Sequence, residues 1–184
     1  VTATVTSGFA LGSDDSDPFT VDAGETDHFV VDAPASATAG DPFTFTVTAY
    51  DELENVTPGF SGTVAFTSTD SQDTLPANYT FTGGDGGAHT FSAGATLRTA
   101  GTQTLTATSG DIEGEDDVDV DPAALDHFLV ESTGGGDIPD QSAGTPFSIR
   151  VTALDAYDNV VESFGGAGKT VEITSTGTLT SGSG

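Results

Sequence analysis

Residues 39–56 read AGDPFTFTVTAYDELENV, and residues 143–160 read AGTPFSIRVTALDAYDNV. In both stretches apolar and polar side chains alternate, which is the pattern of a β-strand that buries one face. The outward positions are mostly Thr, a β-branched residue that suits a solvated strand face. The inward positions of the two copies are Phe43, Phe45, Val47 and Ala49, and Phe147, Ile149, Val151 and Ala153. A strand that recurs in this way predicts an all-β fold of tandem units.

Matches on either side of this strand extend the repeat over most of the chain. Asp27-His28-Phe29 recurs 99 residues later as Asp126-His127-Phe128, and Thr63-Val64 recurs as Thr170-Val171. The spacing between the copies grows only at Gly-rich segments, where loops between strands tolerate insertions. The repeat therefore consists of strands in constant order joined by loops of variable length.

The repeat divides the chain into three predicted pieces. Residues 25–124 are expected to form a complete immunoglobulin-like β-sandwich, because short strands punctuated by Gly and Pro, of which the whole chain has 24 and 8, are typical of that fold. Residues 1–24 match the C-terminal strands of a preceding repeat, and residues 125–184 match the N-terminal part of a further one. The strands predicted for the complete repeat are 27–33, 42–50, 55–57 with 62–69, 78–82, 88–97, 102–109 and 116–121. The predicted interior is Phe29, Phe43, Phe45, Val47, Val64, Phe66, Leu105, Val118 and Val120.

The composition excludes several classes of partner. The net charge is −26, from 29 acidic and 3 basic residues, so we expect no nucleic acid, whose phosphates require Lys and Arg. No apolar run approaches the ~20 residues of a membrane span, so no direct membrane insertion is expected in this segment. The acidic excess has two interpretations, which can coexist: adaptation to high salt, which screens self-repulsion, and binding of Ca²⁺ through carboxylates.

The two quoted stretches, with GTVAFTSTD at residues 62–70, resemble the bacterial immunoglobulin-like repeats of large prokaryotic surface proteins, including invasin/intimin-type adhesins. The resemblance covers nearly the whole chain, and its motifs are structural. It implies tandem sandwiches that act as rods or stalks in an extracellular, cell-surface location. It carries no catalytic residues to this chain.

An Asp-x-x-x-Asn motif lies between two predicted strands in both repeats, at Asp51 to Asn55 and at Asp155 to Asn159. One interpretation is a turn in which Asp and Asn bond their own backbone. The other is a calcium site that also uses Glu52, Glu54 or Asp158. The motif lacks the Gly and the distal Glu of an EF-hand loop.

A second group of candidate calcium ligands lies in the acidic run 111–121. As a solvated strand face, the run would discourage edge-to-edge pairing. As a cation site near a repeat junction, it would stiffen a rod. Like charges on one strand face repel unless a cation or salt intervenes. The candidates here are Asp111, Glu113, Asp117, Asp119 and Asp121.

Two Asn-x-Thr sequons, at Asn55 and Asn78, are candidate glycosylation sites on an exported protein. His28 and His127 occupy matched positions and are expected to pack at the repeat junction. No motif of a hydrolase, metalloprotease or nucleotide-binding enzyme occurs, so we expect a protein that is not an enzyme.

Three functions fit these observations. The first is a structural segment of an extracellular prokaryotic surface protein, such as a stalk, an adhesin shaft or a surface-layer element. The second is a filament subunit that joins copies of itself head to tail by strand complementation. The third is an adhesin domain that binds carbohydrate or protein. The expected partners are neighbouring repeats of the same protein or copies of the chain. The only cofactor considered is Ca²⁺.

Overall fold

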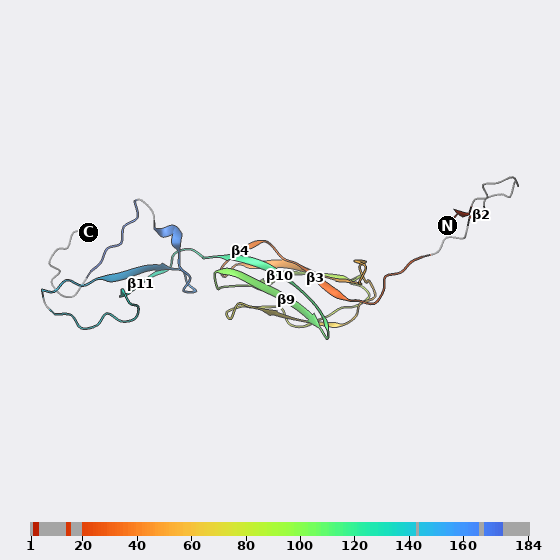
Figure 1. The fold of residues 1–184 in the computed structure, drawn as a ribbon, viewed down its shortest axis with the longest axis horizontal. Coiled ribbons are helices and arrows are strands. Elements are labelled where there is room, and N and C mark those ends of the chain that lie inside the picture. Colours follow the sequence, from red (N-terminus) through yellow and green to blue (C-terminus); the bar gives the residue numbers. More distant parts are fainter. Residues whose placement is uncertain (1, 4–13, 16–19, 143, 166–167, 175–184) are drawn as a thin grey trace.

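The computed structural model describes residues 2–3, 14–15, 20–142, 144–165 and 168–174. The strands between His28 and Asp121 form a sandwich of two sheets, and the hairpin of β11 and β12 follows at one end of it (Figure 1). The fold is therefore the all-β sandwich that the alternation predicted. Within the described residues no helix has the length and apolar character needed to cross a membrane.

The sandwich pairs a five-stranded sheet with a three-stranded one. The larger sheet has the order β4 (Ser36–Thr38), β10 (Ile112–Asp121), β9 (Gly101–Ser109), β6 (Thr63–Ser68) and β7 (Tyr79–Thr80). The smaller has the order β3 (His28–Asp32), β5 (Pro42–Tyr50) and β8 (Ala88–Thr96). Neighbouring strands are antiparallel except for β4 and β10, which are parallel.

The sequence did not predict β4. After β3 the chain leaves the small sheet and joins the large one through β4, so the sandwich has eight described strands rather than seven. The Asp116 carboxylate accepts the N–H of Ala33 at this switch, at 2.9 Å. Three residues are too few to show an alternating pattern. In contrast, the strand predicted at 55–57 forms only a single bridge, between Val56 and Tyr50.

Most of the predicted interior is buried. The buried members are Phe29, Phe45, Val47, Val64, Leu105, Val118 and Val120, whereas Phe43 and Phe66 are half-buried. The central cluster is rich in aromatic rings: Phe45 stacks on Phe91 at 4.9 Å between centroids and meets Phe66 edge-on at 5.6 Å. A smaller cluster of Ala39, Leu97, Val118 and Val120 lies at the end of the sandwich that the second repeat contacts.

The two sheets approach closely where β10 crosses β3. A Cβ atom at Gly114 would lie 2.0 Å from the carbonyl oxygen of Phe29, which is far inside van der Waals contact. Glycine is therefore required at this position of an otherwise acidic strand.

The second repeat forms the same hairpin as the first. In β11 (His127–Ser132) and β12 (Ile149–Leu154), His127 pairs with Leu154, as His28 pairs with Tyr50 in β3 and β5. Strand β12 begins at Ile149, later than predicted. Residues 168–174 form no strand, although Thr170-Val171 matches Thr63-Val64 of β6, and Val171 and Ile173 are exposed. The equivalent strand β6 is held by β7 and β9, and the described part of the second repeat contains no counterpart of either.

At the other end of the chain, β1 (Thr2–Ala3) pairs antiparallel with β2 (Asp14–Asp15). Thr2 lies opposite Asp15 in the way that Thr104 lies opposite Asp117 in β9 and β10. Phe19, whose place in the repeat corresponds to that of Val118, lies outside the described residues. The three predicted domain boundaries stay predictions.

Candidate functional site: the junction between the repeats

The loop after β12 folds around the carboxylate of Asp155. Its Oδ1 accepts the N–H groups of Tyr157 and Asn159, at 2.8 and 2.9 Å. The backbone N–H of Asp155 donates to the carbonyl of Asn159 at 3.0 Å. Asp158 has a φ of 67°, which Asp adopts more readily than most residues. The Asp-x-x-x-Asn motif thus forms the backbone-bonded turn that was one of its two interpretations.

The same loop joins the second repeat to the sandwich. The N–H of Ala123, in the linker between them, donates to Asp155 Oδ2 at 2.8 Å. Asn159 Nδ2 donates to the carbonyl of Arg98 at 2.7 Å, and the N–H of Ala100 donates to Asn159 Oδ1 at 2.8 Å. Asp155 is completely buried and Asn159 nearly so. One amide side chain therefore satisfies a donor and an acceptor of the neighbouring repeat.

Tyr157 supplies the apolar part of the junction. It packs against the small core cluster at the end of the sandwich, and the Arg98 guanidinium lies over its ring, 5.9 Å from the centroid. A Cβ atom at Gly40, whose φ is 86°, would lie 2.2 Å from the Tyr157 hydroxyl oxygen. The sandwich therefore has a glycine where the tyrosine of the next repeat reaches it.

The turn that Asn159 contacts is itself organised by a buried carboxylate, Asp70. The N–H and hydroxyl of Thr99 donate to Asp70 at 2.9 and 2.6 Å, the N–H of Gln72 donates to it at 2.9 Å, and the N–H of Arg98 donates as well. Asp70 was not among the site residues that the sequence predicted. The only signal was an Asp directly after a predicted strand, which is common in turns.

These buried carboxylates are stabilised as anions. For Asp155 and Asp70 burial alone would raise the pKa, but hydrogen bonds to the carboxylates outweigh it and hold each pKa below its usual range. The hydrogen bonds come from Asn159, Ala123 and Tyr157 in the first case, and from Thr99, Arg98 and Gln72 in the second. The junction therefore depends on ionised Asp side chains.

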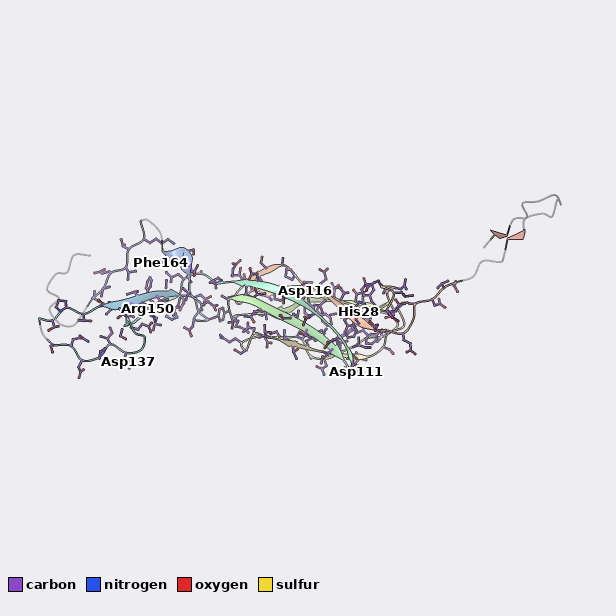
Figure 2. The ribbon with its side chains drawn as sticks, viewed as in Figure 1. His28, Asp111, Asp116, Asp137, Arg150 and Phe164 are labelled. Atoms are coloured by element: carbon purple, nitrogen blue, oxygen red, sulfur yellow. The ribbon has the colours of Figure 1, made fainter. Side chains whose placement is uncertain are left out.

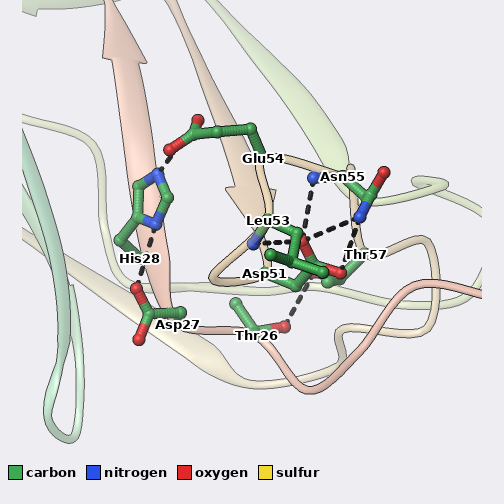
Figure 3. Close-up of polar contacts among 8 residues, drawn as sticks. All are labelled: Thr26, Asp27, His28, Asp51, Leu53, Glu54, Asn55 and Thr57. Atoms are coloured by element: carbon green, nitrogen blue, oxygen red, sulfur yellow. Dashed lines mark hydrogen bonds and ion pairs between the residues drawn. The ribbon is translucent and has the colours of Figure 1, made fainter.

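The first repeat contains the same loop (Figure 3). Asp51 Oδ1 accepts the N–H groups of Leu53 and Asn55, at 3.0 and 2.8 Å, and Asp51 Oδ2 accepts the N–H of Gly24 at 2.8 Å. Backbone hydrogen bonds from Asn55 and Gly24 lower the pKa of Asp51 to about 2. Beside the loop, the hydroxyl groups of Thr26 and Thr57 are hydrogen-bonded to each other at 2.7 Å.

The calcium candidates are spread through the molecule. Figure 2 shows Asp111 in the turn between β9 and β10, away from Asp116, which is the neighbour of the candidate Asp117 in β10. On the exposed face of β10, Thr104 donates to Asp117 at 2.7 Å. The described residues bring together no three His, Cys, Asp or Glu side chains that could hold a metal ion. Calcium binding by Asp51, Glu54, Asp111, Glu113, Asp117, Asp119, Asp121, Asp155 and Asp158 stays a prediction.

The two matched histidines were expected at the repeat junction, but each lies between two carboxylates of its own repeat. His28 Nδ1 is 3.2 Å from Asp27, and its Nε2 is 3.6 Å from Glu54 (Figure 3). His127 sits in the same way between Asp126, at 3.0 Å, and Asp158, at 3.4 Å. His127 thus contacts the junction loop through Asp158, and His28 contacts the equivalent loop of the first repeat through Glu54. A packing role for the two histidines at repeat junctions stays a prediction.

The two sequons differ in their surroundings. Asn78 is exposed at the edge strand β7, and Thr80 of its motif is exposed too. Asn55 is exposed, but its Nδ2 donates to both oxygens of Asp51, at 3.1 Å each, and Thr57 of its motif is buried. Glycosylation of either Asn stays a prediction, and Asn78 is the more accessible acceptor.

Several solved structures are similar to this chain. Domains 5–6 of the S-layer protein SbsC match with a TM-score of 0.37 and 23% identity, over 74% of this chain and 65% of that one. Domains 4–9 match with a TM-score of 0.37 and 23% identity, over 74% of this chain and 21% of that one. The chain thus spans less than two thirds of either structure. No family model and no curated protein matches. At these TM-scores the similarity assigns the chain to no family.

Proposed function

We propose that this chain is a structural segment of an extracellular prokaryotic surface protein: a stalk, an adhesin shaft or a surface-layer element. In such a segment each immunoglobulin-like repeat adds length and contacts only its neighbours. Its partners are the adjoining repeats of the same protein or copies of it. The high negative charge and the Thr-rich strand faces suit a surface that stays solvated along its length.

The observation that carries this proposal is the bridge made by Asn159. A rod transmits orientation only if each repeat is fixed on the one before it, and a flexible linker alone would allow the repeats to swivel. Here the linker is fastened through Ala123, and Asn159 bonds Arg98 and Ala100 across the junction. Tyr157 fills the space between these polar contacts.

The location is tested on intact cells of the source organism. An antibody against the sandwich should label unpermeabilised cells, and brief protease treatment of those cells should release peptides from it. The parent protein, purified and imaged by electron microscopy, should appear as a thin rod. Labelling only after permeabilisation, or compact globular particles, would refute the proposal.

A second candidate, the head-to-tail filament, is favoured by the apolar face of the β11–β12 hairpin. Phe128 and Val130 of β11 are 37% and 47% exposed, and Phe147, just before β12, is 54% exposed, whereas Phe29 and Val31, the equivalents of Phe128 and Val130, are buried in the sandwich. Exposed strand faces of this kind pair with other strands. In the filament, residues 1–24 of one copy would cover residues 125–184 of the next.

Light scattering of the chain over a range of concentrations separates the two candidates. A filament subunit should grow in mass with concentration, and removal of residues 1–19 should abolish that growth. A mass that stays at one chain at every concentration would exclude the filament and leave the tandem segment.

A further inference from the structure

We propose that the other end of the sandwich, at the Asp51–Asn55 loop, is a docking surface for the base of a preceding repeat, with Leu53 and Asn55 as its contact residues. By base we mean the end of a repeat at which the turn between β8 and β9 lies. In this sandwich that turn consists of residues 97–100. The inference rests on the proposed function and names the partner of this particular surface.

The two loops are built alike down to single hydrogen bonds. Gly24 donates to Asp51 Oδ2 as Ala123 donates to Asp155 Oδ2, both at 2.8 Å. The isolated bridge from Tyr50 to Val56 recurs as the bridge from Leu154 to Val160. Glu54 and Asp158 have φ values of 60° and 67°. The first loop thus presents its side chains as the second does.

The loops differ in what their asparagine contacts. The side chain of Asn159 makes one hydrogen bond to Asp155 and two to the neighbouring repeat. Asn55 Nδ2 donates to both carboxylate oxygens of Asp51 (Figure 3), and Asn55 is exposed. Rotation of this amide would reproduce the bridge that Asn159 makes.

Apolar exposure marks the same surface. Leu53 stands where Tyr157 stands in the second repeat, and it is 79% exposed, whereas Tyr157 is half-buried against the sandwich. Val21 is 85% exposed, although Val120, at the matching position before the next linker, is only 3% exposed. A repeat docked here would cover both side chains.

The base of a repeat has the complementary chemistry. At the existing junction the turn offers the carbonyl of Arg98 and the N–H of Ala100 to one amide. It also carries a cation, which suits a loop flanked by the exposed carboxylates of Glu52 and Glu54. The occupant is therefore a further repeat of this construction rather than an unrelated protein.

The test uses the full chain with an added copy of residues 25–123 in place of residues 1–24. The readout is hydrogen exchange at the two Ala100 amides, one in the added copy and one in the original sandwich. We expect both amides to be protected. Asn55→Ala in the original sandwich should speed exchange about tenfold at Ala100 of the added copy alone. Asn159→Ala should speed exchange by the same factor at Ala100 of the original sandwich alone.

Leu53→Ser is the second variant, because the exposure of this side chain predicts an unchanged melting temperature in the original chain. In the extended chain it should speed exchange at the added Ala100. The inference would be overturned if Ala100 of the added copy exchanged fast both with and without the substitutions at residues 53 and 55, while Ala100 of the original sandwich stayed protected. That result would leave the proposed function intact. Fast exchange at both amides without any substitution would overturn both.

Discussion

The carboxylate of Asp155 accepts hydrogen bonds both from its own loop and from the linker between the repeats. Oδ1 accepts the backbone N–H groups of Tyr157 and Asn159 in its own loop, and Oδ2 accepts the N–H of Ala123 in the linker as well as Asn159 Nδ2. The spacing of Asp and Asn predicted the closed loop, because such residues bond nearby backbone. It could not predict the contacts of Asn159 across the junction, because the partners there are backbone groups of Arg98 and Ala100, which leave no mark in the sequence.

The lowered pKa values predict how stability depends on pH. Asp51, Asp70 and Asp155 have lower pKa values folded than unfolded, so their contribution is complete above the unfolded value and is lost as pH falls through the folded one. For Asp51 that window runs from about pH 4 to about pH 2. Thermal melting in about 1 M NaCl, where self-repulsion is screened, should show stability falling across it.

Asp51→Asn provides the matched control for this titration. The variant should be less stable near neutral pH and should lose less stability on acidification than the unmodified chain. Parallel pH profiles for the two proteins would show that Asp51 does not contribute in this way.

At the scale of the strand, β5 shows why alternation was informative. Phe45, Val47 and Ala49 are buried as predicted, because the strand lies between β3 and β8 and packs one face on the other sheet. Phe43 is only half-buried. The pairing of β5 with β8 shifts register between Phe43 and Phe45, and a bulge of this kind does not show in the pattern of β5 itself.

Truncation of Phe45 measures the central core. Its ring is 1% exposed and contacts Phe66 and Phe91, so Phe45→Ala should reduce the free energy of unfolding by roughly 3–5 kcal/mol in urea titration. Val30→Ala, on the exposed face of β3, should cost less than about 1 kcal/mol. Equal losses for the two variants would contradict the assigned strand faces.

At the scale of the whole chain, the sequence predicted which strands recur but not how the repeats meet. The matched segments Asp27-His28-Phe29 and Asp126-His127-Phe128 begin equivalent hairpins, in which His28 pairs with Tyr50 and His127 with Leu154. The sequence predicted that these segments recur, but not the register in which they pair. The contact of Tyr157 with Gly40 could not be foreseen. It depends on how one repeat is oriented on the other, which hydrophobic alternation within a strand does not encode.

The charge of the chain predicts a response to salt. With a net charge of −26 the folded state repels itself, and screening at about 1 M NaCl shortens the Debye length to ~3 Å. The melting temperature should therefore rise between dilute buffer and molar NaCl. A flat or falling melting temperature would remove the interpretation of the acidic excess as an adaptation to salt.

Calcium is distinguished from general screening in the same assay. Carboxylates that bind Ca²⁺ as ligands should give a large rise in melting temperature at millimolar Ca²⁺, and Mg²⁺ at the same concentration should not reproduce it. Equal small shifts with both ions would leave only the general effect of charge.

The central claim is that Asn159 and its loop fix the second repeat on the sandwich. The relative orientation of β3–β10 and β11–β12, obtained from residual dipolar couplings of backbone amides in the full chain, tests it most directly. We predict that the couplings of both units fit one alignment tensor, and that Asn159→Ala reduces the order of β11–β12 relative to the sandwich. Two unequal alignment tensors in the unmodified chain would show that the two units move independently and that the contacts of Asn159 do not fix them.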